Sequence, residues 1–78
     1  MNQDDACAIV GLELGRALNR FPQMASPHEG YAVVLEEMDE LWDIVKADKL
    51  DPSERRDAMV REATQVAAMA LRFLMDCC

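Results

Sequence analysis

The sequence predicts an all-α protein, a three-helix chain that assembles into a homo-oligomeric helical bundle. Hydrophobic residues make up 51% of the 78 residues, and they are mainly Ala, Leu, Val and Met with only four aromatic side chains. This composition favours packed helices. Two segments open with the same type of helix start, S-P-H-E and D-P-S-E, and apolar residues recur after each with a helical period. A chain of this length forms one domain, residues 1–78.

The first expected helix spans about residues 4–19. Its apolar residues follow a helical period, which Gly11 and Gly15 weaken. These two glycines are four apart, a spacing that could permit close packing against a neighbouring helix but is weak evidence for it outside a membrane. The next segment, F-P-Q-M-A-S, is expected to be a loop, because Pro22 restricts the residue before it to extended conformations.

The second expected helix spans about residues 27–47. Ser26 is the expected N-cap, Pro27 suits the first helical position, and Glu29 stands three residues after the cap, as in a capping box. Gly30 is locally unfavourable inside a helix, so we expect it to allow a close approach of another part of the chain to the backbone.

The third expected helix spans about residues 52–76, with Asp51 as its cap, Pro52 at the first position and Glu54 in the capping box. Apolar residues cover well over half of its circumference. Its polar strip is narrow and contains Arg61, Gln65, Arg72 and Asp76. Two short companion helices cannot cover so much apolar surface, so we expect a partner subunit in a homodimer or a homotetramer.

Carboxylates interrupt the apolar sides of the second and third helices. Glu37 projects inside the apolar arc of its helix and Glu40 lies at the edge of that arc, one turn away, while Glu62 projects into the apolar arc of the third helix. An ionised carboxylate in an apolar environment needs a partner, a metal ion or a proton. Three interpretations remain open: an internal salt bridge, a side chain that reaches out to water, and a divalent metal site.

These acidic residues resemble those of a known family. Glu36-Glu37-x-x-Glu40 matches the E-E-x-x-E motif of the MazG-like nucleotide pyrophosphohydrolases, which belong to the all-α NTP pyrophosphatases, and Glu62-x-x-Gln65 stands where that family has E-x-x-D. The resemblance covers roughly residues 26–76. It implies a Mg²⁺-dependent hydrolase, with Mn²⁺ as an alternative ion, that converts a nucleoside triphosphate to the monophosphate and pyrophosphate.

The resemblance also implies roles for single residues. Glu37, Glu40 and Glu62 would be metal ligands and Gln65 would occupy the fourth ligand position, while Glu36 would bind an additional metal or activate water. Mg²⁺ prefers hard oxygen ligands, which these side chains offer. Gln65 departs from the family because its amide carries no charge. The alternative function is therefore a non-catalytic or degenerate MazG-like helical protein that serves in assembly or regulation.

Other features exclude several function classes. A net charge of -7 and a pI near 4.4 argue against binding to nucleic-acid polymers or to anionic membranes. The N-terminal segment lacks a basic start, no apolar run has the length of a membrane span, and the three cysteines fit no zinc pattern. We therefore expect a cytoplasmic protein with reduced thiols.

Two further questions concern groups that would contact a nucleotide. His28 in the first turn of the second helix is expected to be a solvent-exposed turn residue, with a position at the mouth of the site as the alternative. The cations that would bind phosphate remain open. The candidates, most of which we expect to be ordinary surface charges, are Lys46, Lys49, Arg55, Arg56, Arg61 and Arg72.

Overall fold

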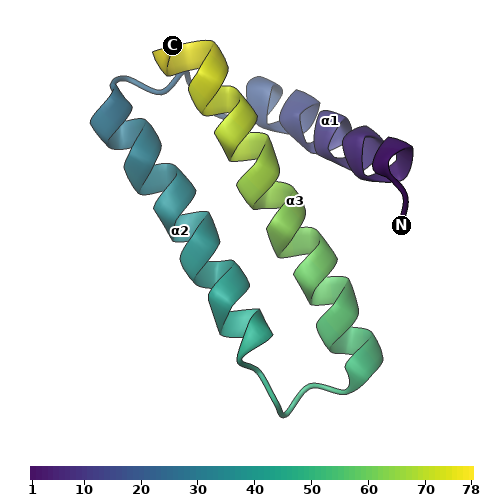
Figure 1. The fold of residues 1–78 in the computed structure, drawn as a ribbon. Helices are drawn as coiled ribbons and strands as arrows, with labels where there is room; N and C mark the ends of the chain where they lie inside the picture. Colours follow the sequence, from purple (N-terminus) through teal and green to yellow (C-terminus); the bar gives the residue numbers. More distant parts are fainter.

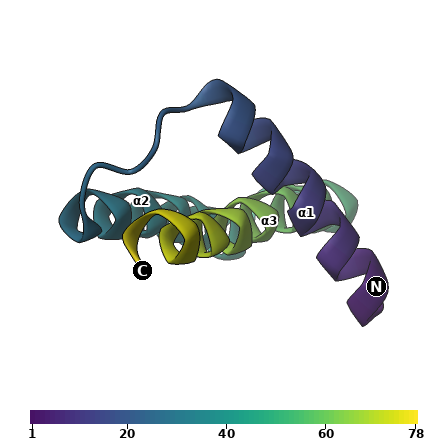
Figure 2. The same ribbon diagram turned by 90° about the horizontal axis from the view of Figure 1, so that it is seen from above.

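The computed structural model describes all 78 residues. Its secondary structure consists of three helices joined by short connections, which confirms the all-α prediction. Helix α1 spans Gln3–Arg20, α2 spans Pro27–Val45 and α3 spans Pro52–Cys77. Figure 1 shows α2 and α3 side by side and antiparallel, and Figure 2 shows α1 crossing α3 obliquely. Helix α1 packs against α3 and not against α2. The face of the α2–α3 pair turned away from α1 is left without a covering helix.

The N-caps of α2 and α3 act as predicted, but the side chains of Glu29 and Glu54 do not bond back to the cap amides, so neither capping box is complete. Ser26 Oγ accepts a hydrogen bond from the backbone N–H of Glu29 at 3.1 Å, and α2 begins at Pro27. Asp51 Oδ1 accepts from the backbone N–H groups of Ser53 and Glu54 at 2.8 and 3.0 Å. These bonds satisfy amide donors that have no partner inside the helix. Each start is therefore fixed by the side chain just before the helix.

The end of α2 falls two residues earlier than predicted, at Val45. Arg55 of α3 donates from its guanidinium to the backbone carbonyls of Ile44 and Val45. Carbonyls in the last turn of a helix lack partners within the helix, and a basic side chain can satisfy them. Arg55, one of the candidate phosphate-binding cations, thus caps α2.

The small hydrophobic core lies where α1, the 21–26 connection and the C-terminal half of α3 meet. Its most buried members are Ala17, Met24, Ala68 and Met69. Gly30 of α2 lies against this core, because a Cβ added there would be 2.7 Å from the ring of Phe73 and 3.0 Å from the sulfur of Met24. The close approach predicted at Gly30 is confirmed.

Within the chain, the two glycines of α1 do not form the close helix contact that their spacing could permit. A Cβ added at Gly11 or at Gly15 would meet no atom within 4 Å. Helix α1 instead packs through Ala17, which is only 3% exposed. Its small side chain, rather than a glycine pair, permits the contact with α3.

Arg72 also differs from the expectation of an exposed polar strip, since it is only 4% exposed. Its guanidinium donates to the carbonyl of Ala17 at 2.9 Å and to those of Phe21 and Pro22 at 2.8 Å each. It also donates to Asp76 Oδ2 at 3.1 Å. Arg72 therefore ties the C-terminal end of α1 and the connection after it to α3.

Asp76 extends this set of contacts to the middle of the connection. The same Oδ2 atom accepts a hydrogen bond from the backbone N–H of Met24 at 3.0 Å. A carboxylate that holds a buried guanidinium and a backbone amide together is well compensated for its burial. We refer to Arg72, Asp76 and their backbone partners as the Arg72 network.

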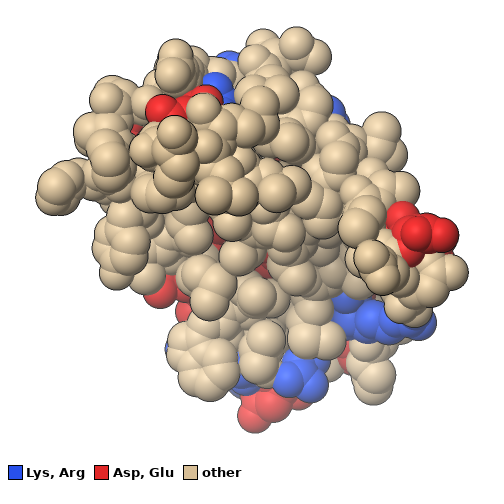
Figure 3. Space-filling model, turned by 45° about the horizontal axis from the view of Figure 1, so that its top comes forward, with Lys and Arg blue, Asp and Glu red and all other residues tan.

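Much apolar surface remains exposed in the single chain. Twelve large hydrophobic side chains are exposed, and the chain has no large side chain that is fully buried. Figure 3 shows a broad uncharged area across the middle of one face, with most acidic and basic side chains at its margins. No helix combines the length and the hydropathy that crossing a membrane requires.

Candidate metal centre

Three carboxylates from two helices converge beside the seam between α2 and α3. Glu37 and Glu40 lie one turn apart on α2, and Glu62 faces them from α3. One carboxylate oxygen from each side chain lies within 4.8 Å of the other two. The structure thus brings together Glu37 and Glu62, which the sequence placed inside the apolar arcs of two helices, and Glu40, which it placed at the edge of one arc.

Glu37 is the most unusual member of this cluster. Its Oε2 atom is buried and has no hydrogen-bond partner. Burial, followed by the negative charge of Glu40 and a side-chain hydrogen bond with Glu40, raises the pKa of Glu37 from 4.5 to about 7, and the charges of Glu62 and Glu36 add to the effect. No cation contacts Glu37, so the internal salt bridge considered for it does not form.

The pKa of Glu62 is also raised, by the same two causes as that of Glu37. Burial and then the charge of Glu40 raise its pKa, while the charge of Arg61 opposes the shift. Arg61 Nε lies 3.8 Å from Glu62 Oε1. Arg61 is thus the candidate cation that lies directly beside the cluster.

The donor set fits a hard divalent cation. Carboxylate oxygens are the ligands that Mg²⁺ prefers, and two oxygens bound to one Mg²⁺ are at most about 4.2 Å apart. The spacing in the cluster is at most 4.8 Å, so small side-chain rotations suffice. An ion bound there would also supply the partner that Glu37 Oε2 lacks.

Glu36 and Gln65, the other two residues of the motif, lie beside the cluster rather than in it. Both line the cavity that Glu37 also lines, and Glu36 is exposed at its edge. Gln65 is half-buried on α3, and its amide is free of protein hydrogen bonds. An amide in this position remains free to bind a ligand.

The cavity has a volume of about 350 Å³ and is bounded by all three helices and the 21–26 connection. Small-molecule sites begin at about 300 Å³. Its lining combines carboxylates near the acidic cluster with apolar side chains near the core, and comprises Glu13, Ala17, Phe21, Pro22, Met24, Glu29, Val33, Glu36, Glu37, Gln65, Met69 and Arg72. The cavity therefore joins the acidic cluster to an apolar compartment.

Sequence reasoning missed Glu13 of α1. It lines the cavity, its side chain is only 17% exposed, and it pairs with Arg16 at 3.3 Å. The signal was present, because Glu13 lies four residues before Ala17 and three after Val10, on the apolar side of its helix. The same periodicity that singled out Glu37 would have identified it.

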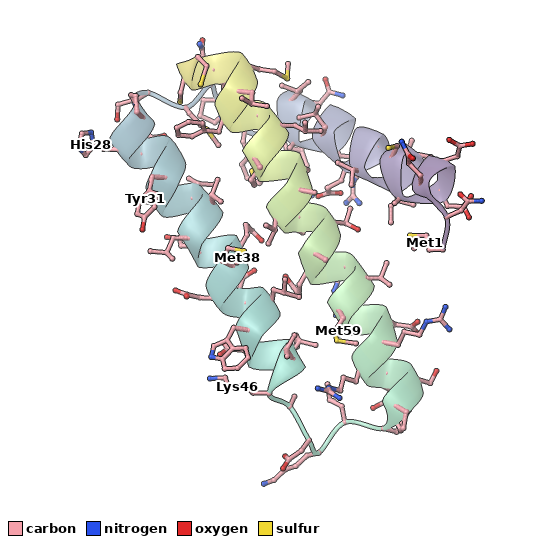
Figure 4. The ribbon with its side chains drawn as sticks, in the orientation of Figure 1. Met1, His28, Tyr31, Met38, Lys46 and Met59 are labelled. Carbon is pink, nitrogen blue, oxygen red and sulfur yellow. The ribbon has the colours of Figure 1, made fainter.

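His28 lies outside the cavity. It is exposed at the N-terminal end of α2, where it borders a shallow hollow with Pro27 and Tyr31. Figure 4 shows its side chain pointing away from the other helices. The position at the site mouth that the sequence left open for His28 is therefore wrong, and the solvent-exposed turn position is confirmed.

No protein family, curated protein or solved structure matches this chain in comparisons of sequence and fold. The residues and their geometry therefore carry the functional assignment that follows.

Proposed function

We propose that this protein is a Mg²⁺-dependent nucleoside triphosphate pyrophosphohydrolase, active as a homo-oligomer. Water would break the bond between the α- and β-phosphates, giving a nucleoside monophosphate and pyrophosphate. Glu37, Glu40 and Glu62 would hold the metal ion, and Mn²⁺ is the alternative ion. The acidic motif on α2 and its counterpart on α3 support this activity by their resemblance to the MazG-like hydrolases.

The observation that carries the proposal is the buried Oε2 atom of Glu37, which has no hydrogen-bond partner although the carboxylates of Glu40 and Glu62 lie beside this side chain. Such an arrangement destabilises the fold without a ligand, because burial and mutual repulsion both oppose ionisation. A divalent cation removes both costs. A purely structural cluster would be expected to contain a cation or hydrogen-bond donors, as the Arg72 network does.

The chain offers groups for each part of the substrate. When bound, Mg²⁺ neutralises phosphate charge and lowers the pKa of the attacking water. Glu36, which is exposed at the edge of the cavity, would accept the proton of that water. The guanidinium of Arg61 lies beside Glu62 and can contact phosphate oxygens. The apolar end of the cavity can take the nucleoside.

The proposal is tested by assaying pyrophosphate release from a panel of nucleoside and deoxynucleoside triphosphates with Mg²⁺ or Mn²⁺. We expect activity that requires the metal, and a loss of more than about 100-fold in kcat/KM for Glu37→Gln, since even outer-shell partners of a metal contribute about 10- to 100-fold. Asp39→Asn is the matched control. It removes one carboxylate from an exposed position of the same helix and should leave activity unchanged.

Gln65 favours the alternative, a non-catalytic helical protein in assembly or regulation, because the amide leaves the acidic cluster one charge short of the family pattern. The two functions differ in a measurable way. Calorimetry that detects metal binding while no substrate of the panel is hydrolysed would favour the non-catalytic protein. The absence of divalent binding, even with nucleotide present, would exclude the metal site and the hydrolase together.

A further inference from the structure

We infer that the face of the α2–α3 pair turned away from α1 is a self-complementary interface for a second copy of this chain. In a two-fold homodimer, a stripe of large side chains on α2 would pack onto a row of small side chains on α3 of the partner. This pairing rests on the homo-oligomer of the proposed function and specifies its interface, but it does not require hydrolysis, so sedimentation and the pyrophosphate assay can fail separately.

Two sets of residues define this face. The α2 stripe consists of Tyr31, Leu35, Met38 and Trp42, which are between 43% and 65% exposed. The α3 row consists of Ala63, Ala67, Ala70 and Leu74. Figure 4 shows the labelled Tyr31 and Met38 along α2.

The spacing within both sets is the same. Each steps by four, three and four residues along its helix, the repeat that keeps one side of a helix against a partner helix in bundles and coiled coils. The two sets differ in size, because α2 presents large side chains and α3 presents mainly alanine. A two-fold rotation places each large stripe opposite a small row, so the knobs of one copy meet the shallow surface of the other.

Helical projection places this face opposite the candidate metal centre. At about 100° per residue, the α2 stripe and the cavity-lining residues Val33 and Glu36 fall on opposite flanks of the side of α2 that contacts α3. Dimerisation through the stripe therefore leaves the cavity open in both copies.

The area also matches a second copy. The chain exposes 5639 Å², whereas a globular monomer of 8.8 kDa exposes roughly 4,800 Å². Its Cα radius of gyration is 13.3 Å, against roughly 11.5 Å for a compact domain of this length. The excess is close to the roughly 800 Å² that each partner buries in a stable interface of standard size.

Charge explains why copies would meet here and not elsewhere. Each chain carries a net charge of -7, so two copies repel each other through most of their surfaces. Neither the α2 stripe nor the α3 row contains an ionisable group that is charged at neutral pH. This face therefore combines the least repulsion with the largest gain from burying apolar surface.

Sedimentation equilibrium at micromolar concentration tests the interface. The wild type should sediment at twice 8.8 kDa, and Met38→Glu should raise the dissociation constant by more than about 30-fold, because it places a charge in the centre of the interface. Leu12→Glu is the matched control. Leu12 is 72% exposed on α1, outside the face, so this variant should remain dimeric.

Ala70→Lys guards against a variant that simply fails to fold. Ala70 is exposed in the single chain, and lysine is a good helix former, so circular dichroism should show a helical monomer. A wild-type protein that is fully helical at the monomer mass would overturn the inference. So would dimers that survive both face variants, or that Leu12→Glu dissociates. A tetramer supports the interface if Met38→Glu lowers its mass, and contradicts it if the mass is unchanged.

Discussion

Arg72 and Glu37 each place an ionisable group among apolar side chains, but their surroundings differ. The guanidinium of Arg72 has four acceptors within 3.1 Å, three of them backbone carbonyls. The buried oxygen of Glu37 has no partner, and its nearest ionisable neighbours are also acidic. The first arrangement stabilises the fold by itself, whereas the second becomes favourable when a proton or a cation arrives. The contrast separates a structural charge from a candidate ligand.

The largest expected effect follows from removing the satisfied charge. Arg72→Met should lower the free energy of unfolding by about 3 to 5 kcal/mol, because it removes the counter-ion of the Asp76 carboxylate and leaves the carbonyls of Phe21 and Pro22 without a donor. Urea denaturation followed by circular dichroism measures this loss. Arg56→Met, an exposed position on the same helix, should change stability by less than about 0.5 kcal/mol. Equal stability of the two variants would show that the Arg72 network is not structural.

The second prediction concerns the unsatisfied charge and has the opposite sign. A carboxyl group whose folded pKa is raised costs no stability below its unfolded value of 4.5, and costs most above its folded value of about 7. Stability should therefore fall between these values as pH rises. The shift corresponds to about 3 kcal/mol, which solvent at the open side of the cluster reduces to about 2 kcal/mol.

Denaturation of Glu37→Gln at about pH 5 and about pH 8 measures that cost, because the variant should lack most of the loss seen in the wild type. Saturating Mg²⁺ or Mn²⁺ at the higher pH should restore wild-type stability and leave the variant nearly unchanged. Asp39→Asn, from an exposed position of α2, should keep the wild-type pH dependence. A variant less stable than the wild type at the higher pH would indicate that the Glu37 carboxylate has a stabilising partner.

A third prediction tests how tightly the core is packed around Gly30, near the C-terminal half of α3. Gly30→Ala should destabilise the protein by about 1 kcal/mol, because crowding against the Phe73 ring outweighs the better helix propensity of alanine. Gly15→Ala is the matched control. It meets no atom within 4 Å and should stabilise α1 by up to about 1 kcal/mol. Thermal unfolding distinguishes the two signs, and stabilisation by both changes would mean that the core is loosely packed around Gly30.

The sequence predicted those features that depend on neighbours along the chain. Ser26 and Asp51 set the starts of α2 and α3, since a cap acts within three residues. Helical periodicity also singled out Glu37 and Glu62 before their helices were seen to meet. Local pattern was sufficient there because each misplaced carboxylate is defined by its own helix.

Features that depend on distant segments were not predictable in this way. Arg72 was expected at the surface because its own helix places it in a polar strip, and nothing local shows that the carbonyls of Phe21 and Pro22 converge on it. The early end of α2 likewise depends on Arg55, which lies ten residues beyond Val45. In both cases an arginine side chain donates to backbone carbonyls that lie far away along the chain.

The smallest expected effect on stability comes from adding a charge beside the unsatisfied cluster. Gln65→Asp restores the acidic residue of the family pattern at a position on the shared cavity, so without metal it should cost about 0.5 kcal/mol at neutral pH through repulsion. Its effect on ligands should be larger. We expect Mn²⁺ to bind about 10-fold more tightly and, if the hydrolase proposal holds, turnover to rise. Gln65→Asn matches the shorter side chain without the charge, so calorimetry of the two variants isolates the contribution of the carboxylate. If both bind Mn²⁺ equally, Gln65 lies outside the coordination sphere, and the contrast between the two regions rests on Glu37, Glu40 and Glu62 alone.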